Sequence, residues 1–69
     1  MIEVFKTNVV KQSQAKTVLK ILQENFNDFK VNFDLADCDK VLRVQGTSIS
    51  PEEIIKLVNA TGYQCEVLD

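Results

Sequence analysis

The residues of this chain that could carry out chemistry are few, and its two cysteines stand first among them. The chain has no histidine, and its sulfur nucleophiles are Cys38 and Cys65. Histidine is the usual general base near neutral pH and the commonest metal ligand in proteins. Without it, and without a paired acid and base on one surface, no nucleophile, base and electrophilic stabiliser can be assembled. We therefore predict a protein that is not an enzyme and that carries no cofactor.

Cys38 lies between two carboxylates in the segment Asp37-Cys38-Asp39. The thiol and the carboxylate oxygens are potential metal ligands, but the segment lacks the length and spacing of a calcium-binding loop. Aspartate is also a common turn residue, because its side chain bonds to nearby backbone. Two interpretations stay open. Cys38 is either an exposed turn residue or a reactive thiol that binds a soft metal ion, alone or as a bridge between two chains.

Cys65 belongs to a different kind of environment. Tyr63, Cys65 and Val67 alternate with polar residues, so they share one face of a predicted strand. A buried free cysteine commonly behaves as a small hydrophobic residue. The predicted fold puts the two sulfurs at opposite edges of the sheet, about three strand spacings apart, which is too far for a disulfide. We expect neither an internal disulfide nor a metal shared by the two sulfurs.

The element that precedes Cys65 is the clearest helix in the chain. Ser50 is a good N-cap, Pro51 fits the first helical position, and Glu53 is placed to close a capping box. Gly62 follows the apolar stripe of this helix and can adopt the left-handed conformation that ends it. A strand from Tyr63 onward must then return the chain to the sheet.

The rest of the chain alternates between strand and helix patterns. A strand is expected over 2–7, although its phase is ambiguous because Ile2 and Val4 would face one side and Phe5 the other. The apolar spacing from Lys11 onward predicts a helix that ends near 25–27. Strict alternation predicts strands over 29–35 and 41–45, joined by a turn over 36–39.

This order of elements predicts one domain of the α+β class, spanning residues 1–69. We expect a ferredoxin-like βαββαβ sandwich: a four-stranded antiparallel sheet in the order 4-1-3-2, with two helices on one face. In that topology the connections at 7–12, 36–39 and 61–63 lie at the same end of the sheet. A functional site, if there is one, is expected at this end.

Three segments of the chain are typical of a known family. They are the Lys40–Gly46 strand (KVLRVQG), the Ser50–Ile55 helix start (SPEEII) and the Gly62–Val67 segment (GYQCEV). With these segments the chain resembles, over essentially its whole length, the heavy-metal-associated domains of copper chaperones and metal-transporting ATPases. The resemblance implies the fold given above and, in the first loop, a Cys-x-x-Cys pair that holds copper(I) between two thiolates.

The cysteine pair of that family is missing from this chain. The family's thiolate positions correspond to Asn8 and Lys11, or to Val9 and Gln12 if the alignment shifts by one residue. Neither alignment supplies a sulfur, and Lys11 would put a cation where the family holds its metal. The resemblance therefore implies a degenerate member: a non-catalytic binding or interaction module without a metal site. The alternative is a metal-handling protein that binds a soft metal ion through Cys38, alone or as a dimer.

The composition limits the partners of such a module. A net charge of −2 argues against nucleic acid, because phosphates demand a clustered basic surface. No apolar run approaches the roughly 20 residues of a membrane span, and we expect a cytoplasmic protein.

Phe5, Val41 and Leu68 are expected on the sheet face away from the helices. We predict contact there, and at Lys11, with an unknown protein partner, or self-association through this open face. A single aromatic, Phe5, disfavours RNA binding.

Overall fold

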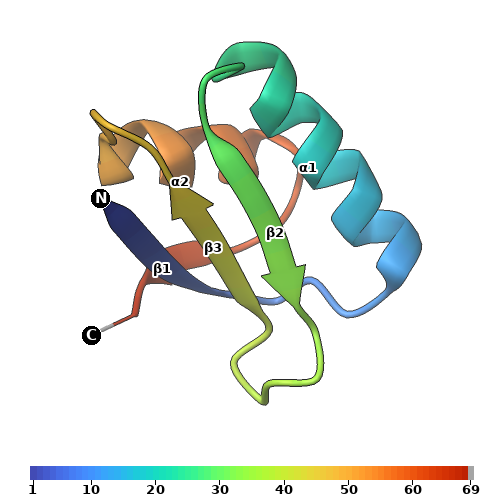
Figure 1. Ribbon diagram of the computed structural model, residues 1–69. Coiled ribbons are helices and arrows are strands. Elements are labelled where there is room, and N and C mark those ends of the chain that lie inside the picture. The colour runs from blue at the N-terminus through green and yellow to red at the C-terminus, as the bar shows by residue number, and fades with distance from the viewer. Residues whose placement is uncertain (69) are drawn as a thin grey trace.

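The secondary structure follows the order expected from the sequence. The computed structural model describes residues 1–68, which form four strands and two helices (Figure 1). The elements are β1 (Ile2–Thr7), α1 (Gln12–Asn25), β2 (Lys30–Asp34), β3 (Val41–Gln45), α2 (Pro51–Ala60) and β4 (Cys65–Val67).

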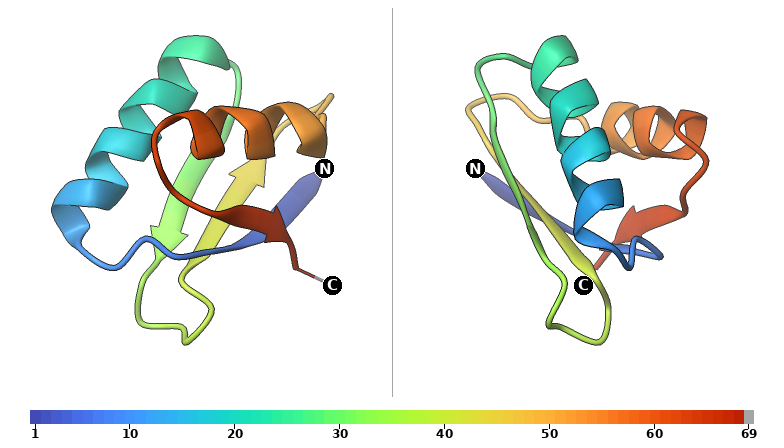
Figure 2. Two further views of the ribbon diagram at one scale, coloured as in Figure 1. Left: turned by 180° about the vertical axis from the view of Figure 1, so that it is seen from behind. Right: turned by 90° about the vertical axis from the view of Figure 1, so that its right-hand side faces the viewer.

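All four strands join one antiparallel sheet. The strand order is β2-β3-β1-β4, which is the expected order 4-1-3-2 counted from the other margin. Both helices lie on the same side of this sheet, as the two views of Figure 2 show, and the opposite face is open. The α+β class and the strand order are therefore confirmed.

Each helix contributes an apolar stripe to the layer between helices and sheet. Ala15, Val18 and Leu22 of α1 are buried at the spacing expected of one helical face, and α2 buries Ile54 and Val58. These side chains join the strands in one hydrophobic core. Within residues 1–68, neither helix combines the length and the apolar character that crossing a membrane would require.

The two ends of α2 differ in how closely they match the predicted caps. Ser50 is the N-cap and Pro51 opens the helix, but the Ser50 side chain makes no capping hydrogen bond, so the expected capping box with Glu53 does not form in the described chain. At the other end Gly62 has φ +102°. Its amide donates to Asn59 O and the amide of Tyr63 donates to Val58 O, which is the expected glycine-terminated helix end.

The structure shows which residues of β1 face the helices, and it overturns the expectation that Phe5 lies on the open face. Phe5 is opposite Leu42 of β3, and Leu42 is opposite Phe33 of β2, so all three face the helices. Phe5 is 0% exposed. The placement of Phe5 on the open face was wrong, because the core gains more from burying the larger aromatic side chain than from burying Val4. Ile2 and Val4 consequently lie on the open face.

Gly46 ends β3 beneath an aromatic ring. A Cβ atom built at this position would lie 2.7 Å from Cε1 of Phe29 and closer still to its Cδ1, so the ring occupies the space that a side chain would need. Phe29 in turn stacks on Phe26, with ring centroids 5.3 Å apart and an interplanar angle of 9°. The glycine thus lets the α1–β2 connection pack directly on the end of β3.

Candidate functional site

Three connections meet at one end of the sheet, as the topology predicts. The amide of Thr7 donates to Asp39 O at 3.1 Å, which joins the end of β1 to the β2–β3 loop. The amide of Gln64 donates to Oδ1 of Asn8 at 2.8 Å, which joins the first loop to the segment before β4. We call this arrangement of residues 8–11, 35–40 and 61–64 the loop end.

Thr7, the last residue of β1, is a buried polar residue next to the loop end, with a relative exposure of 7%. Its hydroxyl donates to Lys40 O at 2.6 Å and accepts a hydrogen bond from the amide of Val9 at 3.2 Å. Lys40 has the left-handed conformation, with φ +48°, which is uncommon for a residue with a side chain. The Thr7 hydroxyl therefore stabilises both the first loop and the turn that leads into β3.

The first loop contains Asn8 and Lys11, at which the first of the two alignments from the sequence resemblance expects thiolates. Asn8 and Lys11 are exposed, whereas Val9 between them is fully buried in the core. Lys11 is the N-cap of α1, and Oε1 of Gln14 accepts hydrogen bonds from the amides of Lys11 and Val10 at 3.0 and 3.2 Å. The first loop thus presents an amide and an ammonium to solvent. An ammonium has no free electron pair with which to bind a metal, and the oxygen of an amide is a hard ligand that does not suit a soft metal ion.

The ammonium of Lys11 lies at the N-terminus of α1, where the helix dipole disfavours a positive charge. The N-terminus of a helix carries a partial positive charge, and the first turn of α1 contains no acidic residue to balance it. Lysine also has no acceptor with which to cap the free amides of the first turn. A thiolate at this position would be stabilised by the same helix end that disfavours the lysine.

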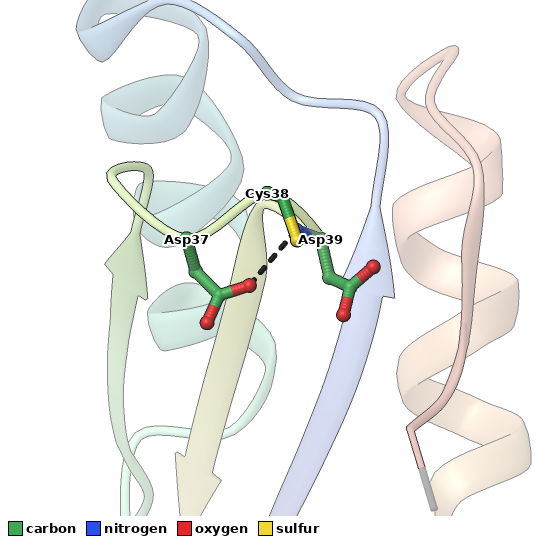
Figure 3. A group of neighbouring side chains, drawn as sticks. All are labelled: Asp37, Cys38 and Asp39. Atoms are coloured by element: carbon green, nitrogen blue, oxygen red, sulfur yellow. Dashed lines mark hydrogen bonds between the residues drawn. The ribbon is translucent and has the colours of Figure 1, made fainter.

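The Asp37-Cys38-Asp39 segment projects from the β2–β3 loop (Figure 3). The sulfur and one oxygen of each carboxylate lie within 4.8 Å of one another, and Cys38 is exposed. Asp37 Oδ1 accepts a hydrogen bond from the amide of Asp39 at 2.9 Å, as in an Asx turn. Asp39 lies 4.0 Å from Nζ of Lys6, an ion pair with exposed members. The Asp37 carboxylate thus takes part in the turn, the Asp39 carboxylate pairs with Lys6, and the thiol is accessible to solvent.

Cys65 behaves as the hydrophobic residue that its strand position predicts. It is 9% exposed, and burial, with a smaller contribution from Glu66, raises the pKa of its thiol to about 12. A thiol with this pKa is protonated at neutral pH and is a poor nucleophile. Cys65 lines an open hollow of about 380 Å³ together with polar residues of β1, α2 and β4. Both cysteines within residues 1–68 are free thiols, so they form no internal disulfide.

The open face of the sheet carries two of the three apolar residues expected there. Val41 and Leu68 share this face with Ile2 and Val4, since Val4 is opposite Arg43 and the amide of Leu68 donates to Val4 O. Val41 is only 5% exposed, because it lies between Lys6 of β1 and Asp34 of β2. Ile2 is 57% exposed and replaces Phe5 as the prominent apolar side chain of this surface.

Sequence reasoning did not identify Thr7 or Gln64 as residues that organise the loop end. The signal for Thr7 was weak, because a threonine at the end of a strand is usual on either face. Gln64 acts through its backbone amide, which every residue except proline possesses, so its type carries no signal.

A scan against protein-family models finds no match to the chain, and a search of curated proteins finds none either.

Proposed function

We propose that this chain is a small non-catalytic binding module with a ferredoxin-like βαββαβ fold, similar to heavy-metal-associated domains but without their metal site. The observation that carries the proposal is that Asn8 and Lys11, both exposed in the first loop, occupy the positions that the resemblance aligns with the two thiolates. The strand order and the position of both helices on one face support the fold. The buried, protonated thiol of Cys65 and the lack of histidine support a role without catalysis.

The hydrogen bonds of the first loop support a structural role for the residues that replace the cysteines. Oδ1 of Asn8 accepts the amide of Gln64, so this side chain holds two connections of the loop end together. In a metal-binding loop the corresponding side chain must be free to turn toward the ion. The Asn8 side chain is instead fixed by this hydrogen bond, which connects two segments that are far apart in sequence.

The open sheet face is the candidate contact surface of this module. Ile2, Val4, Val41 and Leu68 form its apolar part, and charged residues of all four strands surround them. A protein partner that covers this face would remove Ile2 from water, which is the main gain available there. Lys11 lies at the loop end and offers a separate cationic contact.

The proposal is tested by adding copper(I) to the reduced protein in the presence of a competing chelator and recording native mass spectra. We expect no stoichiometric complex with the unmodified chain. Introducing Asn8→Cys together with Lys11→Cys should create binding of one copper(I) ion per monomer, because both positions are exposed and one is a helix N-cap. Asn8→Ser with Lys11→Ser is the matched control without sulfur.

Two results would contradict the proposal. One is tight binding of a single copper(I) ion by the unmodified monomer. The other is a folded double-cysteine variant that binds no more copper(I) than its serine control, since a scaffold of the heavy-metal-associated type should accept the restored pair.

A second candidate function is metal handling through Cys38, in one chain or as a bridge between two. Its support is the exposed thiol with one carboxylate oxygen on each side, all within 4.8 Å. Zinc is the natural probe, because it accepts sulfur and carboxylate ligands together. Zinc binding that disappears in Cys38→Ser but persists in Cys65→Ala would favour this function. Zinc binding that is unchanged in Cys38→Ser would exclude it.

A further inference from the structure

Strand β2 forms one margin of the sheet and pairs with a neighbour on one side only. Its partner is β3, and Lys30–Asp34 is the full length of the strand. In Figure 1 it is the outermost strand on the side of α1, and in the right-hand view of Figure 2 it runs beside that helix. An uncovered edge strand without proline is a template for pairing with another strand. Within Lys30–Asp34 there is no proline.

The hydrogen-bonding alternation of the sheet identifies which backbone groups of β2 point outward. The amide of Gly46 donates to Met1 O at 3.0 Å, so Val44 and Leu42, two and four residues earlier, also direct their backbone groups toward β1. The intervening residues of β3 bond to β2, where their partners are Lys30, Asn32 and Asp34. Val31 and Phe33 therefore direct their amides and carbonyls away from the sheet. No loop hydrogen bond within residues 1–68 reaches these groups.

The sequence of β2 is complementary to itself when read in the opposite direction. In an antiparallel pair of two copies centred on Asn32, Val31 is opposite Phe33 of the second copy, with their outward backbone groups bonded to each other. Lys30 is then opposite Asp34 of the second copy, and this contact occurs twice. These charged residues fall on the non-hydrogen-bonded positions, where opposing side chains approach most closely. Both are exposed on the open face of the sheet.

The charges of Lys30 and Asp34 also favour this alignment over the alignments that are shifted by one or two residues. A shift of two residues in one direction sets Asp34 against Asp28 of the second copy, and a shift in the other direction sets Lys30 against Ala36. Shifts by one residue do not bring the outward backbone groups into register. Only the alignment centred on Asn32 combines paired backbone groups, opposed apolar side chains and opposite charges.

The other margin of the sheet lacks this complementarity. The amide of Leu68 donates to Val4 O, so Val4 and Lys6 are the hydrogen-bonded positions of β1 on this side, and Glu66 bonds inward to Lys6. The alignment of two copies of β4 that pairs Cys65 with Val67 of the second copy, and so uses both outward residues, is centred on Glu66. That alignment sets Glu66 against itself at a close position, and like charges in this arrangement are destabilising.

We propose that two copies of this chain associate through β2, in antiparallel register centred on Asn32, and thereby extend the sheet across a two-fold axis. The occupant of this edge is a second copy, because the order lysine–apolar–asparagine–apolar–aspartate complements itself. One short strand pair buries a small area, so we expect a reversible dimer whose population rises with concentration. This association uses neither the loop end nor the apolar part of the open face.

The test measures the molecular mass by sedimentation from about 1 µM to about 1 mM protein under reducing conditions, the range of small reversible interfaces. Lys30→Asp sets aspartate against Asp34 twice, and Asp34→Lys sets lysine against Lys30 twice. Each variant alone should raise the dimer dissociation constant by about tenfold or more, because attraction becomes repulsion at two sites. An equimolar mixture of the two variants should restore association as a heterodimer, since each contact then joins lysine and aspartate.

Further variants separate this dimer from general effects of charge. The double variant with Lys30→Asp and Asp34→Lys should dimerise like the unmodified chain. Lys56→Asp on α2 and Glu52→Lys on α2 alter the net charge by the same amounts at exposed positions and should leave association unchanged. Hydrogen exchange gives an independent reading, because the amides of Val31 and Phe33 should become protected as the concentration rises.

Three results would overturn the proposal. The first is a monomer throughout the concentration range. The second is a dimer that is insensitive to Lys30→Asp and Asp34→Lys. The third is a dimer that is abolished by Ile2→Asp on the open face while both edge variants retain it, which would assign self-association to the open face instead.

Discussion

The hydroxyl of Thr7 donates to the carbonyl of Lys40 at 2.6 Å, across 33 residues of sequence. The same hydroxyl accepts the amide of Val9. This single side chain therefore links the end of β1, the first loop and the left-handed turn at Lys40.

Replacing Thr7 with valine should lower the free energy of unfolding by about 1–3 kcal/mol. Valine keeps the shape and strand preference of threonine but leaves the Lys40 carbonyl and the Val9 amide without their partner. Urea denaturation followed by circular dichroism measures the change. Thr7→Ser retains the hydroxyl and should lose less than Thr7→Val. A valine variant as stable as the unmodified chain would show that these hydrogen bonds add no net stability.

Replacing Lys11 with serine should raise the free energy of unfolding by about 1 kcal/mol. Serine at the N-cap can accept an amide of the first turn, and Gln14 already accepts the amide of residue 11, so a complete capping box becomes possible. Thermal denaturation measures the gain. Lys16→Ser, at an exposed position inside α1, removes the same charge without access to the cap and should be slightly destabilising.

A loss of stability in Lys11→Ser would contradict this account of the helix start. The gain in stability expected of Lys11→Ser also bears on the function of Lys11. A residue that costs stability at an exposed position of the candidate site is the kind of residue that a binding role would retain.

Alkaline pH should destabilise the fold through Cys65. Its pKa is raised from 9.0 to about 12 in the folded chain, so the unfolded thiol ionises first as the pH rises. The stability that depends on the protonated Cys65 thiol is fully present below pH 9. Between pH 9 and pH 12 the free energy of unfolding falls progressively, by up to about 1.4 kcal/mol per pH unit. Stability curves in urea at several pH values, under reducing conditions, measure this slope.

Cys65→Ala provides the comparison for the pH series, because all other titrating groups are shared with the unmodified chain. The variant should have the shallower dependence above pH 9, whatever its stability at neutral pH. Parallel slopes for the two proteins would contradict the assignment. In the unmodified chain, iodoacetamide at neutral pH should label exposed Cys38 well before buried Cys65.

The helices and the strand order could be predicted because several local signals agreed with one another. For α2 the cap at Ser50, the proline at Pro51, the apolar stripe and the stop at Gly62 all indicated the same boundaries. The meeting of three connections at one end then followed from topology alone. Agreement among levels of structure is what makes such a segment readable from its sequence.

The phase of β1 could not be predicted, because its sequence fits both faces of a sheet. Ile2 and Val4 favour one phase, while Phe5 favours the other with Thr7 beside it. Burying Phe5 also buries Thr7, and the Thr7 hydroxyl then needs a partner, which is the Lys40 carbonyl of a distant turn. Since the cost of burying a hydroxyl is set by tertiary contacts, local pattern does not reveal it.

The environments of the two cysteines and the side-chain hydrogen bonds at the loop end and at the start of α2 were only partly predictable for the same reason. The exposure of Cys38 and the burial of Cys65 agree with their sequence positions. The hydrogen bond from Gln64 to Asn8 joins residues 56 positions apart, and the capping box at Ser50 does not form although its residues are present. Whether a polar side chain finds its partner depends on geometry finer than the spacing of residue types.

The bare backbone at Gly46 has a further consequence for β2. Because the ring of Phe29 rests on this glycine, the start of the edge strand is anchored to the end of its only neighbour. Fraying of β2 from its first residue would have to lift that ring away from the glycine and out of its stack with Phe26. The contact between Phe29 and Gly46 thus holds β2 at its first residue, where edge strands usually fray. The free edge of β2 is therefore already ordered before another strand pairs with it.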